Sequence, residues 1–398
     1  MKKHLIHFLI IVQSIVFSMA QHQTSYINQY ISLDTVLLFP NKIRVNNAPL
    51  AYSLWGHSLA FINYNGFISD TIKVCFYDLK THQINTVHLC VTDFFDKTIR
   101  IIFLAHNESY ICIGDFHQVY VFRKVEEKYV YDKNIQIDKY VSYVSFLDSN
   151  TLFLYGIKNG QNPPSSLSTY HIKTGEKIKE INPDFQHPLF SYFGPKNVID
   201  VKNDKILFSH QRHYMSTIFY KNLDTAHNIE AKHIKWIELN NKYIEKINRK
   251  YDITYPLNII DAVEKKHPHI HQQRWAYLIN EDKIICVYQP PYHKNKIPVS
   301  MIDIWEKKED VFELKEQGIM DLLGIKAEND SIGNHSFGLG FLSGSQYVFT
   351  DNQVIVFKSY AANINPLYMQ LSDFYKQTNE YFLKNSPVVA IYVYTHTF

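Results

Sequence analysis

The sequence is poor in cysteine, nearly balanced in charge, and short of long hydrophobic runs after its first twenty residues. Four cysteines in 398 residues are too few for a compact disulfide framework. Lysine and arginine total 41 against 38 aspartate and glutamate, a net charge of +3, so charge does not point to nucleic acid or an anionic membrane. No later stretch offers the roughly 20 apolar residues that a membrane span needs. We therefore expect no nucleic-acid partner and no transmembrane span.

Familiar catalytic motifs are also missing. The sequence contains no Gly-x-Ser-x-Gly elbow, no Gly-rich phosphate loop, no His-Glu-x-x-His and no Asp-box repeat, and no carboxylate pair stands out for glycoside chemistry. His267, His269 and His271 form the densest histidine cluster, but no carboxylate lies nearby at ligand spacing. A solvated loop is favoured over a metal site there. We predict no cofactor and no metal, and catalytic residues stay unassigned.

The first twenty residues read as a secretory signal peptide. Lys2 and Lys3 precede an apolar core over Leu5–Phe17, and Ser18-Met19-Ala20 is a small-x-small cleavage site before Gln21. The apolar core is too short for a membrane anchor. We expect a mature chain from residue 21 that is exported to the periplasm or the cell exterior and is soluble after cleavage.

A repeat dominates the mature chain. Two strands separated by a polar turn recur at intervals of roughly 40–55 residues in the first half and at longer intervals afterwards. The turns centre on Asn65, Asn107, Ser149, Asp204, Asp282 and Gly344. Four-stranded repeats of this length are typical of a β-propeller, whose blades must stack to bury their faces. We predict an all-β fold with one propeller domain over residues 21–398.

A second landmark recurs near the end of the modules. An aromatic or apolar residue is followed by a turn that often contains Lys-Thr, as in Tyr77–Gln83, Tyr170–Glu176, Tyr220–Thr225 and Ile304–Lys308. Gly175 follows Lys173-Thr174 and suits the positive φ of a tight hairpin loop. This pattern resembles the turn between the third and fourth strands of WD40, quinoprotein-like and TolB-like propellers. The resemblance implies the fold and no catalytic residues.

Ring closure leaves the number of blades open. Thr35–Phe39 and Val388–Thr395 are apolar strands at opposite ends of the mature chain, and propellers often build one blade from both termini. Six modules with a shared closing strand predict six blades, which we favour. Seven is the alternative.

Whether two of the cysteines can form a disulfide depends on the strand register. If the Tyr77–Gln83 hairpin centres on His82-Gln83, Cys75 and Cys90 face each other and can bridge; if it centres on Thr81-His82, Cys75 faces His88. Cys112 and Cys286 also lie in apolar strands. We favour mostly reduced, buried thiols.

Long segments concentrate at one predicted end of the ring. The turns between first and second strands are short, whereas the turns between second and third strands and the crossings between blades are long. We predict a helical insert at about 235–274, a further helix at 319–327 and a C-terminal helix at about 370–384. Binding residues concentrate on long loops held by a rigid scaffold.

Seven residues at this end are the candidate ligand-binding set. Arginine and histidine beside flat aromatic rings suit an anionic or sugar-like ligand. They are Arg212, His213, Tyr214, Arg274, Trp275, Tyr292 and His293.

Three functions remain compatible with the sequence. The favoured one is an exported, non-enzymatic binding propeller whose partner is a protein or a small polar or sugar-like ligand. The others are a carbohydrate-active propeller lyase or hydrolase, and a structural subunit of an envelope assembly that docks through the segment 235–274.

Signal cleavage gives the first testable prediction. Mass spectrometry of the protein recovered outside the cytoplasm should show an N-terminus at Gln21. Ala20→Arg should block cleavage, because the residue before the cut must be small. Recovery of a cytoplasmic chain that still begins at Met1 would contradict the assignment.

Overall fold

The computed structural model describes residues 29–40, 51–62, 71–91, 101–157, 165–182, 199–210, 215–230, 272–289, 299–322, 346–360 and 388–398. Twenty-four strands fall in these ranges, and no α-helix does. The strands form six antiparallel sheets of four strands each. Each sheet is one blade of a propeller, so the prediction of six blades is confirmed.

Blades 1 to 3 follow one another along the chain. Blade 1 is β2 (Tyr52–Trp55), β3 (Ser58–Ile62), β4 (Thr71–Asp78) and β5 (Ile84–Cys90). Blade 2 is β6 (Phe103–His106), β7 (Tyr110–Gly114), β8 (Gln118–Val125) and β9 (Lys128–Gln136). Blade 3 is β10 (Tyr140–Phe146), β11 (Thr151–Ile157), β12 (Ser165–His171) and β13 (Lys177–Ile181).

Blades 4 to 6 complete the ring. Blade 4 is β14 (Ile199–Lys202), β15 (Lys205–His210), β16 (Met215–Tyr220) and β17 (Thr225–Glu230). Blade 5 is β18 (Gln272–Asn280), β19 (Lys283–Gln289), β20 (Val299–Lys308) and β21 (Val311–Leu322). Blade 6 is β22 (Gln346–Phe349), β23 (Gln353–Tyr360), β24 (Val388–His396) and, on its outer edge, β1 (Ile31–Pro40).

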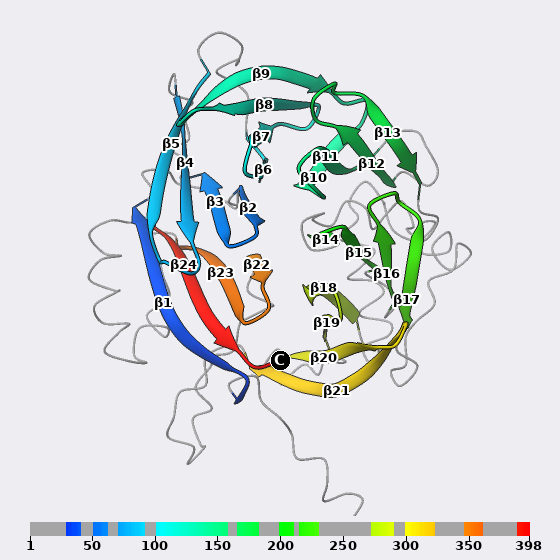
Figure 1. The fold of residues 1–398 in the computed structure, drawn as a ribbon. Helices are drawn as coiled ribbons and strands as arrows, with labels where there is room; N and C mark the ends of the chain where they lie inside the picture. Colours follow the sequence, from blue (N-terminus) through cyan, green and yellow to red (C-terminus); the bar gives the residue numbers. More distant parts are fainter. Residues whose placement is uncertain are drawn as a thin grey trace, which may run out of the picture.

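The six sheets surround a common axis (Figure 1). In the order given above for each blade, the first strand lies nearest the axis and the fourth lies on the rim. The inner strands are therefore β2, β6, β10, β14, β18 and β22, and side chains on them are the ones that meet at the centre of the ring.

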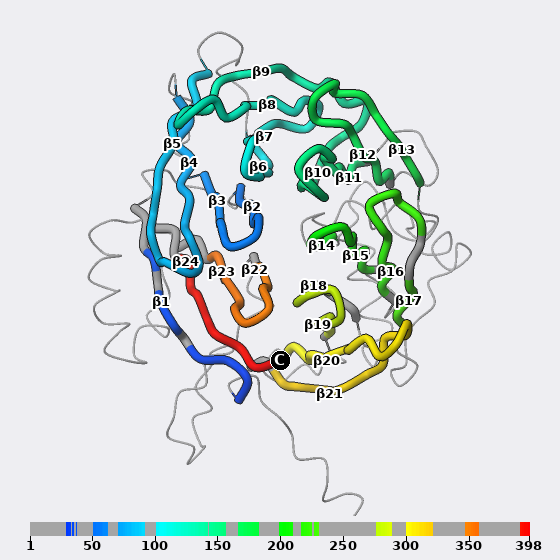
Figure 2. Tube along the Cα trace, in the orientation of Figure 1, coloured from blue at the N-terminus to red at the C-terminus, as the bar shows by residue number. Residues whose placement is uncertain are grey.

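Strands from opposite ends of the described part of the chain close the ring in blade 6. The N-terminal strand β1 pairs antiparallel with β24, with Leu37 opposite Ile391 and Thr35 opposite Val393 (Figure 2). The predicted strands at Thr35–Phe39 and Val388–Thr395 are thus confirmed and pair with each other. The blade is composite, as in a closed propeller, but it is the sixth blade and not a seventh.

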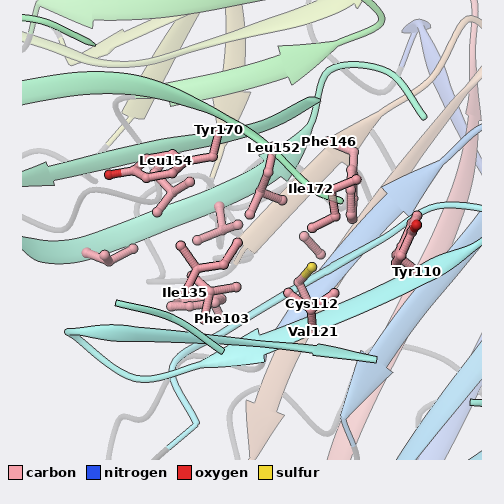
Figure 3. Close-up of a cluster of buried hydrophobic side chains, with 14 of the residues drawn as sticks. Phe103, Tyr110, Cys112, Val121, Ile135, Phe146, Leu152, Leu154, Tyr170 and Ile172 are labelled. Carbon is pink, nitrogen blue, oxygen red and sulfur yellow. The ribbon is translucent and has the colours of Figure 1, made fainter. Parts of the chain in front are cut away.

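Successive side chains of a strand pack alternately into the interfaces on the two faces of its blade. In β6, Leu104 packs toward blade 1 while Phe103 and Ala105 pack toward blade 3. The buried apolar residues form six clusters, one between each pair of neighbouring blades. Figure 3 shows the cluster shared by blades 2 and 3. The core of this protein is therefore a set of interfaces between sheets, so each blade depends on its neighbours.

Four of the six predicted inner turns are correct, and two are wrong. Asn107, Ser149, Asp204 and Asp282 lie between the first two strands of blades 2 to 5. In blade 1 this turn is at Gly56, whose φ of 57° lies in the left-handed region, and Asn65 falls later, between β3 and β4. In blade 6 the turn follows Phe349, so Gly344 precedes the inner strand.

The outer hairpins match the second predicted landmark. Gly175 has the positive φ expected of it, 77°. His82, Leu223 and Glu309 hold positive φ in the matching hairpins of blades 1, 4 and 5, so the backbone shape persists where glycine is absent.

The helix predicted at 319–327 is wrong over its described part, because β21 continues to Leu322. Ile319 is buried opposite Ile302. Just before it, Gly318 adopts a φ of 70° and donates its N–H to the buried Asp303 carboxylate at 2.8 Å, where Tyr288 also donates at 3.3 Å. This irregularity in the strand satisfies a buried charge and keeps the apolar face of the strand in register.

Neither predicted hairpin centre gives the observed cysteine register. Cys75 lies opposite Thr86, and Cys90 lies opposite Thr71. The two thiols therefore cannot bridge, and all four cysteines are reduced. Cys75, Cys112 and Cys286 are buried as predicted, whereas Cys90 is exposed.

The other predicted helices lie outside the described residues. This holds for 370–384 and for 235–274, except that Gln272–Arg274 begins β18. Within the ranges that the structure covers, no helix has the length and apolar character required to cross a membrane.

A buried histidine generates a prediction about pH. His106 ends β6, and neither of its ring nitrogens has a hydrogen-bond partner in the described part of the chain. Burial lowers the pKa of His106 to about 3, and the Ser58 backbone offsets this only in part. The unfolded chain takes up this proton near pH 6.5, so the free energy of unfolding should fall as the pH drops from about 6.5 toward 3.

His106→Leu should remove this contribution. Urea unfolding at pH 8 reports the packing change alone, because the histidine is then neutral in both states. Between pH 8 and pH 4 the variant should lose less stability than the parent. Parallel profiles for the two proteins would rule out this role for His106.

Candidate functional site

The two ends of the ring differ in which strand connections lie there. At one end, called here the turn face, the first strand of each blade turns into the second and the third into the fourth. At the other, the connector face, the second strand leads to the third and each blade leads to the next. Every internal stretch outside the described residues starts and finishes at strand ends on the connector face. All the turn-face connections belong to the described ranges.

Two of the seven predicted site residues lie within the described part of the chain. Arg274 and Trp275 lie near the start of β18, where the register with β19 shifts between Gln273 and Trp275. The other five lie outside the described residues, between β15 and β16 of blade 4 and between β19 and β20 of blade 5. Topology brings these strand ends to one sector of the ring; convergence of the side chains stays a prediction.

Below that sector, inner strands bring a carboxyl group and three phenols to the axis. Asp200 lies on β14, and Tyr52, Tyr143 and Tyr277 lie on β2, β10 and β18. Asp200 Oδ2 accepts the Leu278 N–H at 2.7 Å, which links blades 4 and 5. These four residues, defined here as the axial cluster, come from four different blades.

The axial cluster shares one electrostatic environment. Burial raises the pKa of the Asp200 carboxyl, opposed by the Lys202 charge and by N–H groups of Leu278 and Val201. Burial also raises the pKa of Tyr52, Tyr143 and Tyr277, and the Asp200 charge adds to the rise in each. The phenols therefore stay neutral at physiological pH, and the Tyr52 hydroxyl donates to the Tyr347 carbonyl at 3.5 Å. Titratable groups perturbed in this way are candidate binding groups.

Lys202 closes the axial cluster toward the turn face. Its Nζ donates to the carbonyl oxygens of Leu278 at 3.2 Å, Phe349 at 2.8 Å, and Ile279, so one side chain ties blades 4, 5 and 6. Burial lowers the pKa of Lys202, opposed by the charges of Asp200 and Asp351. Lys202 thus joins three blades at the turn-face end of the axis.

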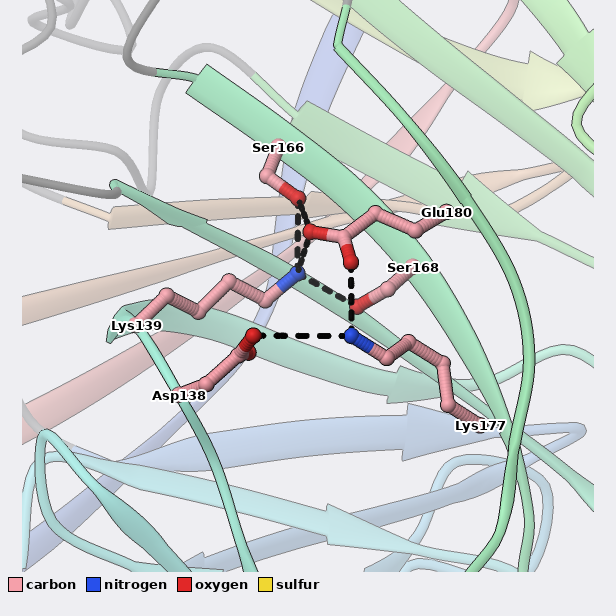
Figure 4. A network of polar contacts seen from close by, with 6 residues as sticks. All are labelled: Asp138, Lys139, Ser166, Ser168, Lys177 and Glu180. Carbon is pink, nitrogen blue, oxygen red and sulfur yellow. Dashed lines mark hydrogen bonds and ion pairs between the residues drawn. The ribbon is translucent and has the colours of Figure 1, made fainter. Parts of the chain in front are cut away.

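A buried ion network lies beside the connector face in blade 3 (Figure 4). The Lys139 side chain is fully buried; its Nζ donates to Ser166 Oγ at 2.9 Å and Ser168 Oγ at 2.6 Å and lies 3.5 Å from Glu180 Oε1. Ser166 Oγ donates to the same carboxylate. Lys177 Nζ contacts Glu180 Oε2 at 2.7 Å, and Glu180 is the main cause of a raised pKa at Lys177.

Gly156 makes room for this network. A Cβ atom at Gly156 would lie 2.9 Å from Cγ and Cδ of Lys139, so the lysine stem crosses the strand where no side chain stands. The network ties the crossing from blade 2 to two strands of blade 3. Its groups are satisfied by one another, which is typical of a structural tie and not of a catalytic lysine and serine.

Sequence reasoning missed the axial cluster and Lys139. A signal for both was present: charged residues interrupt apolar strands at Asp200 and Lys202, and at Lys139 between Ile137 and Val141. A propeller inner strand is buried on both sides, so a charge there needs a partner. The partners come from distant strands, which a linear pattern does not identify.

Metal ligands do not gather in the part of the chain that the structure covers. No three histidine, cysteine, aspartate or glutamate side chains are placed there to hold an ion. The cluster at His267, His269 and His271 lies outside it.

Known proteins resemble this chain in fold alone. No family model and no curated protein matches it. Among solved structures, a member of the DUF4221 family from Bacteroides vulgatus has a TM-score of 0.49 at 10% identity, covering 92% of this chain and 98% of its own. The WD40 domain of coronin from Toxoplasma gondii has a TM-score of 0.37 at 7% identity, and the match covers 82% of this chain and 72% of that domain's chain. Apo AztD from Citrobacter koseri has a TM-score of 0.32 at 11% identity. The match covers 46% of this chain and only 47% of the AztD chain.

The blade 3 network generates an asymmetric prediction. Glu180→Gln leaves the Lys139 ammonium buried without a countercharge and should cost about 3–5 kcal/mol in the free energy of unfolding. Lys139→Met should cost less, because Lys177 still compensates Glu180. The double variant should be more stable than Glu180→Gln alone.

An exposed ion pair provides the control, measured in the same denaturant titrations. Lys179 and Asp224 lie 2.8 Å apart on the surface, and Asp224→Asn should cost less than about 1 kcal/mol. Equal effects of Glu180→Gln and Asp224→Asn would contradict the assigned role.

Proposed function

We propose that this chain is an exported, non-enzymatic binding propeller that holds a small polar or sugar-like ligand at its connector face, over the axial cluster. The observation that carries the proposal is the division between the two faces. At the turn face, short described turns join the strands and Lys202 joins blades 4, 5 and 6, whereas the internal stretches outside the described residues begin and end at the connector face. Loops on a rigid scaffold are where binding residues concentrate.

The axial cluster favours binding over glycoside hydrolysis. That reaction requires two carboxyl groups placed about 5–9.5 Å apart. The described inner strands hold one acidic residue, Asp200, and its neighbours on the axis are phenols and Lys202. Neutral phenols around one carboxyl group suit recognition of a hydroxylated ligand. Docking through residues 235–274 within an envelope assembly stays a separate prediction, because that segment is undescribed up to Gln272.

A thermal-shift panel tests the proposal on the mature chain 21–398. The probes are monosaccharides, disaccharides, dicarboxylates and amino acids, each at millimolar concentration. A ligand at a hundredfold excess over its Kd stabilises the folded state by about 2.7 kcal/mol, so a bound probe should raise Tm measurably. The double change Arg212→Ala, His213→Ala should abolish that rise, and Asp200→Asn should reduce it.

Tyr220→Ala is the control on the turn face, where the residue ends β16. It should leave the rise in Tm intact. A rise that survives both the double change and Asp200→Asn would place the ligand elsewhere. Conversion of the stabilising sugar into a product, followed by mass spectrometry, would favour the enzyme alternative.

A further inference from the structure

Three rings gather on the connector face at the corner between blades 2 and 3. The rings of Phe116 and Tyr140 stack with their centroids 3.9 Å apart and their planes at 22°. His117 meets Tyr140 edge-on, with centroids at 6.0 Å and planes at 88°. These residues, defined here as the corner platform, come from the turn between β7 and β8 and from the first residue of β10.

The corner platform is held rigidly by its backbone. Asp115 Oδ1 accepts the N–H groups of His117 at 2.9 Å and Gln118 at 3.0 Å, which fixes the turn. The Phe116 carbonyl accepts the Val141 N–H at 2.7 Å, and the His117 carbonyl accepts the Ile137 N–H at 2.9 Å. Between them, Lys139 anchors the crossing in the blade 3 network. The rings are therefore pre-organised, which lowers the entropic cost of binding.

Tyr140 stands apart from the other exposed apolar side chains. Eight large hydrophobic residues are exposed in the described ranges, and seven lie toward the turn-face end of third and fourth strands. Those seven are Ile84, Val125, Val130, Tyr131, Ile178, Tyr220 and Val311. Tyr140, with 39% of its surface exposed, is the one on the connector face.

Polar groups border the rings. The Asn134 amide donates to Gln118 Oε1 at 3.4 Å, at the start of β8 beside the turn. Asp138 lies 3.6 Å from Lys177, with about half of the carboxylate side chain exposed. The amides of Asn134 and Gln118 and the carboxylate of Asp138, which are near the rings along the chain, supply both donors and acceptors.

We propose that the corner platform binds a glycan by stacking a pyranose ring on the exposed ring of Tyr140. A pyranose has a flat face of C–H groups and a rim of hydroxyls, and the platform has flat rings with a polar border. A stable protein partner would need about 800 Å² on each side, and one exposed ring with its two neighbours supplies far less apolar surface. The inference does not depend on the axial cluster.

Affinity electrophoresis in native gels tests the proposal. The gels contain barley β-glucan, xylan or β-1,4-galactan, and the sample is the mature chain. At least one polysaccharide should retard the parent protein. Tyr140→Ala should weaken the apparent Kd at least tenfold, and Tyr140→Phe should keep it within about threefold because the stacking ring remains.

Matched variants separate this site from others. Tyr220 is equally exposed, at 40%, but lies on the turn face, so Tyr220→Ala should bind as the parent does. Tyr140→Ala should leave the rise in Tm with small ligands intact, so failure of the axial site and failure of the corner platform are distinguishable. Unchanged Tm values show that each variant is folded.

Two results would overturn the proposal. One is a parent protein whose mobility is unaffected by all three polysaccharides. The other is retardation that Tyr140→Ala leaves unchanged, or that Tyr220→Ala reduces equally.

Discussion

Burial of apolar side chains between neighbouring blades is the constraint on which the rest of this structure depends. A four-stranded sheet with apolar side chains on both faces cannot leave either face exposed to water. Such a sheet is therefore stable only between two neighbouring sheets. The six clusters satisfy this condition around the whole ring, including the cluster between blades 6 and 1. Strands β3 and β4 of blade 1 and β23 and β24 of blade 6 form that last interface, and Leu37 of β1 packs against it.

The same constraint explains how charged groups inside the ring are placed. Burying a charge is costly unless it is paired and hydrogen-bonded. Lys139 meets two hydroxyls and a carboxylate within blade 3, Asp303 meets an N–H and a phenol within blade 5, and Lys202 meets carbonyl groups of two other blades. Each of these polar arrangements joins segments that the apolar clusters alone do not hold in a unique register. Polar ties and apolar interfaces therefore act together.

The fold was predictable from the sequence because its signals are local and repeated. Turns at Asn107 and Ser149 lie between short alternating strands, and Gly175 takes the expected backbone conformation. Prediction failed where local signals compete. Asn65-Gly66 is a stronger turn signature than Gly56-His57, yet the strand pairs around Gly56, since Leu54 and Leu59 face each other across it. Ile319 suggested a helix, but burial opposite Ile302 extends the strand.

The candidate sites were less predictable, for a physical reason. Asp200, Tyr143 and Tyr277 are far apart along the chain and become neighbours only because inner strands share an axis. Phe116 and Tyr140 are closer in sequence, but their stacking depends on the short crossing that Lys139 anchors. Aromatic residues are frequent in this chain, and most of them pack between blades, so composition cannot separate a binding ring from a core ring. What separates Tyr140 is its position, because within the described ranges it is the exposed large apolar residue at the connector face.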